Sequence, residues 1–121
     1  MKVACDLDNT IDAAPQQMQS LMSALMAAGH RVTVVTGTQS DQATQQDFDD
    51  KANYLNSLGC GQSFDDLVVL AAPPGDLANA KAEFLSANGY HVLIDNDKGN
   101  AKAATKAGVP LVLVPWASRT P

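Results

Sequence analysis

The stretch VACDLDNT, residues 3–10, decides the fold of this chain. Val3–Cys5 is a short apolar run, typical of the first strand of a buried sheet, and Asp6 and Asp8 follow where that strand ends. Positions i and i+2 of a strand point to the same side, so both carboxylates lie in one small volume. They repel each other unless a cation or a shared proton neutralises them, and Mg²⁺ suits paired oxygens. A solvated Asp-rich turn is the alternative at this point.

The rest of the chain alternates between apolar runs and helical patterns. Strands are expected at Val3–Cys5, His30–Thr36, Leu67–Leu70, Tyr90–Ile94 and Leu111–Val114. Helices are expected at Gln16–Ala28, Asp41–Leu58, Asp76–Ala87 and Asn100–Ala107, with Asp76 as a cap. The strands are continuously apolar, which predicts burial on both faces. We therefore expect an α/β fold, a three-layer α/β/α sandwich with a five-stranded parallel sheet of the Rossmann-like kind.

Length and composition limit the domain organisation. The chain has 121 residues, 45% of them hydrophobic, which predicts a single globular domain over residues 1–121. The expected apolar contacts of the second helix are Phe48, Tyr54, Leu55 and Leu58. Trp116 is expected as a packing residue near the last strand, and the last residues of the chain are expected to be frayed. The net charge of −5 opposes broad binding of nucleic acid, except as a phosphorylated end.

The sequence also favours a compartment. Asp6 interrupts the first apolar run too early for a secretory signal, and no apolar run is long enough to span a membrane. We expect the cytoplasm, with both cysteines reduced. Cys5 is expected as a small buried side chain and Cys60 as a loop thiol, and their spacing does not match a zinc site.

Ligands of open parallel sheets bind beyond the carboxyl ends of the strands. The residues expected at that edge are Asp6, Asp8, Thr36, Gly37, the turn Pro73–Gly75, and Asp95–Asp97. A carboxylate beside Mg²⁺ can attack phosphorus, and a second carboxylate can protonate the leaving alcohol and then activate water. A hydroxyl, backbone N–H groups and a Lys can hold phosphoryl oxygens.

Lys81 is the leading candidate for that Lys because its helix precedes the fourth strand. Lys98 and Lys102 are rivals after the strand, and Lys98 reads better as a solvated charge. In isolation, Lys81 also reads as a solvated helix residue, and Thr36 as an ordinary strand-end hydroxyl.

With these residues in order, the chain resembles the haloacid dehalogenase-like (HAD) superfamily of phosphotransferases over almost its whole length. The first motif of that family, Asp-x-Asp-x-Thr, is matched by residues 6–10, with Asn9 where many members have Gly. Thr36 matches the second motif and Lys81 the third. Asp95 and Asp97 match the acidic fourth motif, with Asn96 between them.

The resemblance implies a Mg²⁺-dependent phosphohydrolase that acts on a phosphomonoester through a phospho-aspartyl intermediate. By resemblance, Asp6 is the nucleophile and Asp8 the general acid and base. The Asp8 carbonyl, Asp6 and Asp95 would hold Mg²⁺, with Asp97 binding through water or orienting Asp95. Thr36, Gly37 and Lys81 would bind the phosphoryl group.

Family members usually carry a cap domain, but neither insertion point has room for one here. The minimal, capless form suits a large phosphorylated substrate, such as a polymer end or a protein, or a site completed in a homo-oligomer. Two other classes share parts of the pattern. A phosphoacceptor receiver domain fails because its acceptor Asp ends the third strand, which here ends at residues 70–72. A catalytically silent binding or scaffold protein of the same fold stays open.

Overall fold

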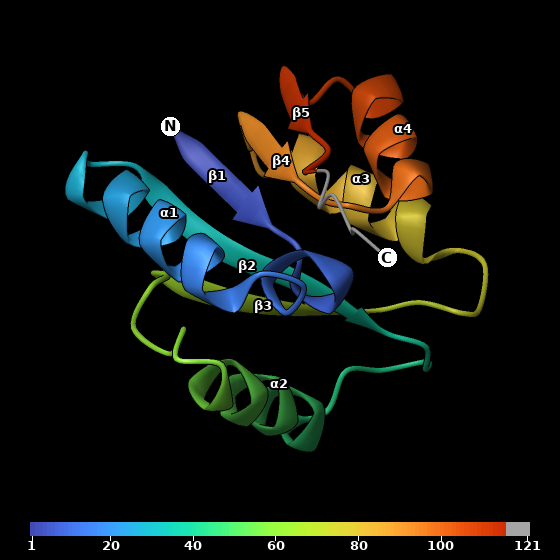
Figure 1. The fold of residues 1–121 in the computed structure, drawn as a ribbon. Coiled ribbons are helices and arrows are strands. Elements are labelled where there is room, and N and C mark those ends of the chain that lie inside the picture. The colour runs from blue at the N-terminus through green and yellow to red at the C-terminus, as the bar shows by residue number, and fades with distance from the viewer. Residues whose placement is uncertain (116–121) are drawn as a thin grey trace, which may run out of the picture.

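The computed structural model describes residues 1–115, so Trp116 and the expected frayed end lie outside the described residues. A five-stranded parallel sheet has helices on both faces, which confirms the predicted three-layer α/β/α sandwich (Figure 1). The strands are β1 (Lys2–Cys5), β2 (Arg31–Thr38), β3 (Asp66–Ala71), β4 (Val92–Ile94) and β5 (Leu111–Leu113). The helices are α1 (Pro15–Ala27), α2 (Gln45–Ser57), α3 (Leu77–Ala87) and α4 (Lys98–Ala107), and a short turn, η1 (Leu7–Ile11), follows β1.

The order of the strands is β3-β2-β1-β4-β5, so β1 is the central strand. The chain builds outward from β1 through β2 to β3, and then crosses to the other side of β1 for β4 and β5. Such a reversal opens a crevice at the carboxyl end of the central strands, because the two following loops turn away from each other. Strand order alone therefore predicts a ligand site just after β1.

Both faces of the sheet are apolar because successive β1 residues pack into different layers. Val3 and Cys5 belong to a buried cluster with Met22 of α1 and Leu55 of α2. Ala4, between them, packs in a second cluster with Leu85 of α3 and other residues of α3 and α4. The edge strands differ from the expectation of two-sided burial: β3 is half-buried, and Leu111 and Leu113 of β5 are exposed. Edge strands lack a neighbour on one side, so their side chains are covered less completely.

Several element boundaries differ from the prediction, and each has a local cause. Gly37 does not end β2, because β3 continues beside it and pairs with it as far as Thr38. The second helix begins at Gln45 rather than Asp41, because Thr44 forms a reciprocal capping box with Asp47. Residues 41–44 therefore belong to a loop.

The ends of α3 and α4 also depart from the prediction. Asp76 stands at the N-cap of α3, but its side chain makes no capping hydrogen bond. The fourth helix begins at Lys98 instead of Asn100, because the Asp97 carboxylate accepts the Asn100 N–H at 3.0 Å and caps it.

Three side chains differ from the prediction in how far they are buried. Phe48 and Tyr54 are 39% and 40% exposed, so α2 packs mainly through Leu55, which is fully buried. Cys60 lies in the loop between α2 and β3, as predicted, but its side chain is fully buried in the core on the α1 and α2 side of the sheet. Cys5 is buried as predicted. Among the helices of residues 1–115, none has both the length and the hydrophobicity that a bilayer crossing requires.

Candidate active site

The site forms where β1 stops and its neighbours lead away. Cys5 is the last residue of β1 in register, opposite Val34 of β2 on one side and Ile94 of β4 on the other. Beyond this point β2 continues to Thr38 in contact with β3, while the chain after β1 turns into η1. The side of β2 that faced β1 is therefore open from Thr36 onward.

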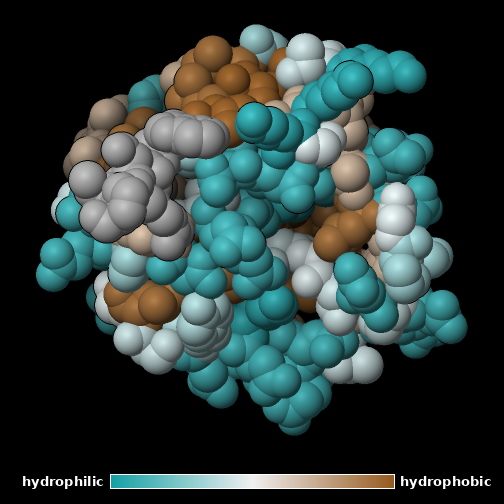
Figure 2. All heavy atoms as spheres, turned by 45° about the vertical axis from the view of Figure 1, so that its right-hand side comes forward, coloured by the Kyte–Doolittle hydropathy of each residue, from teal (hydrophilic) through white to brown (hydrophobic). Residues whose placement is uncertain are grey.

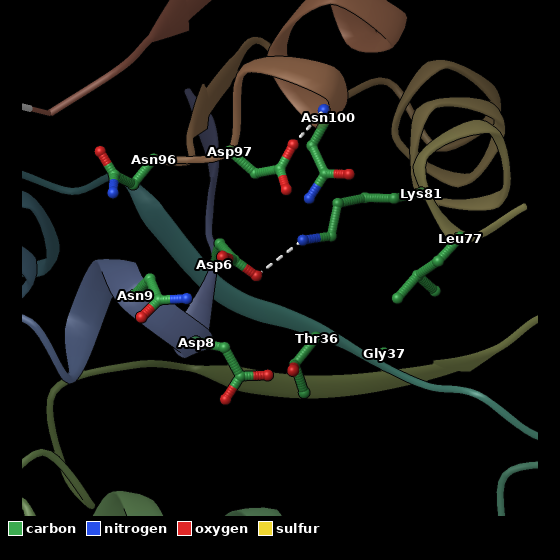
Figure 3. A pocket seen from close by; sticks show the side chains of 10 residues that line it. All are labelled: Asp6, Asp8, Asn9, Thr36, Gly37, Leu77, Lys81, Asn96, Asp97 and Asn100. Carbon is green, nitrogen blue, oxygen red and sulfur yellow. Dashed lines mark hydrogen bonds and ion pairs between the residues drawn. The ribbon is translucent and has the colours of Figure 1, made fainter. Parts of the chain in front are cut away.

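A cleft of about 380 Å³ occupies this space, and most residues of the predicted edge line it (Figure 3). Asp95 and the turn Pro73–Gly75, which were also expected there, are not part of its lining. Its lining comes from the turn after β1, the end of β2, one face of α3, and the start of α4: Asp6, Asp8, Asn9, Thr36, Gly37, Leu77, Lys81, Asn96, Asp97 and Asn100. Figure 2 shows a face of the molecule that is covered mainly by hydrophilic side chains, with separate hydrophobic patches. Most of the residues that line the cleft are polar or charged, so the cleft suits a charged ligand better than an apolar one.

Asp6 lies at the bottom of the cleft and is held from three sides. Its backbone N–H continues the sheet by donating to the Ile94 carbonyl at 2.9 Å. One carboxylate oxygen accepts from Lys81 Nζ at 2.7 Å, and the other accepts from Thr10 Oγ1 at 3.3 Å. The residue is only 7% exposed. Such fixing gives a carboxylate one orientation toward the cleft, which a nucleophile requires.

Lys81 is 2% exposed, so its interpretation as a solvated helix residue is wrong. It reaches from α3 toward Asp6 (Figure 3), and its ammonium also bonds Asp95 Oδ2 at 3.1 Å. Of its two rivals, Lys98 and Lys102 both lie exposed on α4. The long side chain of Lys81 thus places one positive charge between carboxylates from the ends of β1 and β4.

The buried surroundings of Asp6 and Lys81 shift the pKa values of both side chains. Burial is the main cause that raises the pKa of Asp6, to about 6; the Lys81 ammonium opposes this rise and the nearby Asp95 carboxylate adds to it. Burial works against the charge of Lys81, but Asp6 and Asp95 outweigh it and raise the Lys81 pKa. One ammonium shared by two carboxylates leaves an excess of negative charge in a poorly solvated place.

Asp95, expected as a direct metal ligand, and Asp97, expected to bind through water or to orient Asp95, have different positions in the structure. Asp95 is 0% exposed and lies behind the cleft lining. Its oxygens accept the Asp97 N–H at 2.9 Å and the Asn100 amide at 3.0 Å, in addition to the contact with Lys81. Asp97 is exposed and lines the cleft. The backbone of Asp97 thereby orients Asp95, while its own carboxylate faces the cleft and caps α4.

The turn η1 carries Asp8 past the end of the strand. Asn9 has φ +60°, the left-handed conformation that Asn tolerates better than most residues, so Asn can stand where the related motif has Gly. The turn closes with the Ile11 N–H donating to the Asp6 carbonyl at 3.4 Å. The Asp8 side chain is 58% exposed at the cleft, with Lys51 Nζ 3.7 Å from one oxygen. Asp8 therefore stands higher in the cleft than Asp6, nearer the solvent.

Thr36 is more than a strand-end hydroxyl. It is 0% exposed and lines the cleft, and its Oγ1 finds no hydrogen-bond partner among residues 1–115. A buried hydroxyl without a partner is costly, so such an atom points to a ligand that completes it. At Gly37 a Cβ would clash with the side chain of Leu77 from α3. Glycine there lets the first turn of α3 approach β2 closely and keeps the floor of the cleft open.

A hydrated divalent cation fits this set of oxygens. Among residues 1–115, no three acidic, His or Cys side chains converge as a ready-made cation site. The carboxylates of Asp6, Asp8 and Asp97 all line the cleft, however. The single positive charge of Lys81, which is paired with Asp6, does not neutralise the three negative charges. Mg²⁺ usually keeps several waters and takes one or two carboxylates plus substrate phosphate, so it does not need a closed cage.

Three contributions to the site were missed by sequence reasoning. Thr10, matched only as part of the motif, bonds Asp6 and accepts the Asn96 N–H at 3.0 Å, which ties η1 to the loop after β4. Asn100 lines the cleft and donates its side-chain amide to Asp95. The three-residue spacing from Asp97, typical of a helix cap, could have indicated that Asn100 lies near the acidic residues. Lys51 reaches Asp8 from α2, and its position in the sequence contains no signal for that contact.

Comparison with models of known protein families gives no match to this chain, and neither does a search among curated proteins. The likeness to the HAD superfamily therefore depends on the four motifs and on where the fold places them.

Proposed function

We propose that this protein is a Mg²⁺-dependent phosphohydrolase, a minimal member of the HAD superfamily, that cleaves phosphomonoesters through a phospho-aspartyl intermediate. The observation that supports this most directly is that a fixed, buried Asp6 shares its cleft with a Thr36 hydroxyl that has no hydrogen-bond partner among residues 1–115. The Asp6 carboxylate is oriented as a nucleophile would be, and the Thr36 hydroxyl could donate a hydrogen bond to a phosphoryl oxygen.

The proposed chemistry assigns one task to each of these side chains. A carboxylate oxygen of Asp6 attacks phosphorus, the bond from phosphorus to the substrate oxygen breaks, and Asp8 gives its proton to that leaving oxygen. Water then attacks the phosphorus of the aspartyl-phosphate, Asp8 takes the proton of that water, and phosphate leaves from Asp6. Lys81 and Thr36 hold the phosphoryl oxygens while charge builds up on them.

Mg²⁺, when bound, would neutralise charge on the phosphoryl oxygens. The carboxylates of Asp6 and Asp97 and the Asp8 carbonyl are the residues that would hold it, with Asp95 supporting them from behind through Asp97 and Lys81.

The surroundings of the cleft bear on the substrate and on the setting in which the protein works. Only η1 separates β1 from α1, and only α2 and β3 lie between β2 and α3, so neither place holds an inserted cap domain. An open polar cleft favours a large phosphorylated substrate or a homo-oligomer that closes the site. Two buried free thiols fit a reducing compartment such as the cytoplasm.

The test is hydrolysis of an aryl phosphate with and without Mg²⁺. Asp6→Asn should lower turnover by about a thousandfold or more, because Asn cannot act as the nucleophile. Asp76→Asn is the matched control: Asp76 is exposed and its side chain makes no capping bond, so turnover should be unchanged. A phosphoryl group trapped on Asp6 in an Asp8→Ala variant, seen by mass spectrometry, would support the intermediate. Normal turnover in Asp6→Asn would overturn the proposal, and a wild-type chain that binds phosphate without hydrolysis would favour the scaffold alternative.

A further inference from the structure

The helix α2 contacts the turn that carries Asp8 at two points. Lys51 Nζ lies 3.7 Å from Asp8 Oδ2. One turn further along α2, the Tyr54 hydroxyl donates to Asp12 Oδ2 at 2.8 Å. The other oxygen of Asp12 accepts the backbone N–H of Asn9 at 2.6 Å. A continuous chain of contacts thus leads from α2 to Asp8 and to the residue after it.

The two contacts are more than incidental surface pairs. Lys51 and Tyr54 are three residues apart and so share one face of α2. Within residues 1–115, Asn9 is the one residue other than glycine with a positive φ, and such a conformation lasts only where its surroundings support it. Asp12 gives that support directly, and Tyr54 holds Asp12 in place.

Asp8 needs such help because of where it stands. Its side chain is 58% exposed, whereas a general acid must stay within hydrogen-bond reach of the leaving oxygen. The Lys51 contact is an ion pair at 3.7 Å and not a short hydrogen bond, so the carboxyl oxygens of Asp8 stay available for a proton.

We propose that Lys51 and Tyr54 are positioning residues for proton transfer by Asp8. Tyr54 acts through Asp12 to hold the turn, and Lys51 limits the rotation of the Asp8 side chain over the cleft. This inference rests on the phosphohydrolase function proposed above. It assigns to α2 a role at the site that no motif of the sequence indicates.

The decisive readout is the dependence on the leaving group. An alkyl phosphate needs a proton on its leaving oxygen, whereas an activated aryl phosphate hardly does, and kcat/KM reports the step in which that bond breaks. Lys51→Met and Tyr54→Phe should lower kcat/KM for the alkyl ester by about 10- to 100-fold and for the aryl ester by less than about threefold. Lys51→Arg, which keeps the charge, should restore most of the loss.

Matched controls lie on the other face of the sheet. Lys106→Met removes an exposed Lys from the last turn of α4, and Ser86→Ala removes an exposed hydroxyl that donates to the Ala107 carbonyl at 3.0 Å. Both should leave the two esters unaffected. Equal losses on both esters in Lys51→Met and Tyr54→Phe would show a merely structural role and overturn the inference.

A second measurement needs no turnover. Amide hydrogen exchange at Asn9 should speed up in Tyr54→Phe and in Asp12→Ala, and the double variant should exchange no faster than Asp12→Ala alone. Unchanged exchange in Tyr54→Phe would overturn the chain of contacts. A wild-type protein that cleaves neither ester would instead overturn the phosphohydrolase function and the catalytic part of this inference, while the exchange data would still show whether Tyr54 holds the turn.

Discussion

Replacing Lys81 with Met removes an ammonium group that lies between two buried carboxylates. Asp6 and Asp95 are 7% and 0% exposed, and the ammonium contacts them at 2.7 and 3.1 Å. At an effective dielectric constant of about 20, each contact is worth about 5–6 kcal/mol before desolvation is subtracted. Most of this is offset by the cost of burying the Lys. The variant, however, keeps two buried charges without their partner, and breaking a buried pair in this way costs about 3–5 kcal/mol.

The stability lost in Lys81→Met should depend on pH in a definite direction. The folded pKa of Asp6, about 6, exceeds the unfolded value of about 3.9. Between these values the native state binds more protons than the unfolded state, so stability falls as the pH rises from about 4 to about 6. Without the lowering effect of Lys81, the folded pKa of Asp6 rises further, so the fall is larger and continues above pH 6. The difference between wild type and variant should therefore be large near pH 7 and small near pH 5.

Urea unfolding followed by circular dichroism measures both effects. Lys102→Met, which removes an exposed Lys of α4, is the control and should change the free energy of unfolding by less than about 0.5 kcal/mol. Should Lys81→Met be unfolded at pH 7, recovery of the fold near pH 5 is the expected sign of carboxylate repulsion. A loss below about 1 kcal/mol at pH 7, or an equal loss at both pH values, would refute the reasoning.

Two further predictions concern the buried Thr36 hydroxyl and the buried thiols of Cys5 and Cys60. Thr36→Val should leave the free energy of unfolding unchanged or slightly higher, because the Thr36 hydroxyl has no partner in residues 1–115, but should weaken competitive inhibition by inorganic phosphate by about 5- to 10-fold. Weakened stability with unchanged inhibition would assign that hydroxyl a structural role. Cys5 and Cys60 are both fully buried, and burial raises the pKa of the Cys5 thiol to about 12, so a thiol reagent should modify neither until the protein unfolds. Rapid labelling of the native protein would contradict this.

Much of the site could be predicted from the sequence because parallel sheets bring strand ends together. Val3–Cys5 and the later apolar runs were enough to indicate the sheet, and the acids after two of those strands then had to meet at one edge. Asn9 could likewise be expected in the left-handed conformation, because that preference is a local property of the residue. Local patterns of this kind act over a few residues, and a single sequence displays them.

Long-range packing decided the rest. Asp95 and Asp97 both belong to the acidic run after the fourth strand, and only the three-dimensional arrangement buries the first behind Lys81 and places the second at the cleft. The contacts of Lys51 with Asp8 and of Tyr54 with Asp12 depend on how α2 docks against the sheet, through Leu55. The docking of a helix is set by the shapes of both surfaces, so no spacing along the chain encodes it. The sequence alone thus determined the order of the elements and the edge at which acids gather, while the tertiary structure decided which side chains touch there.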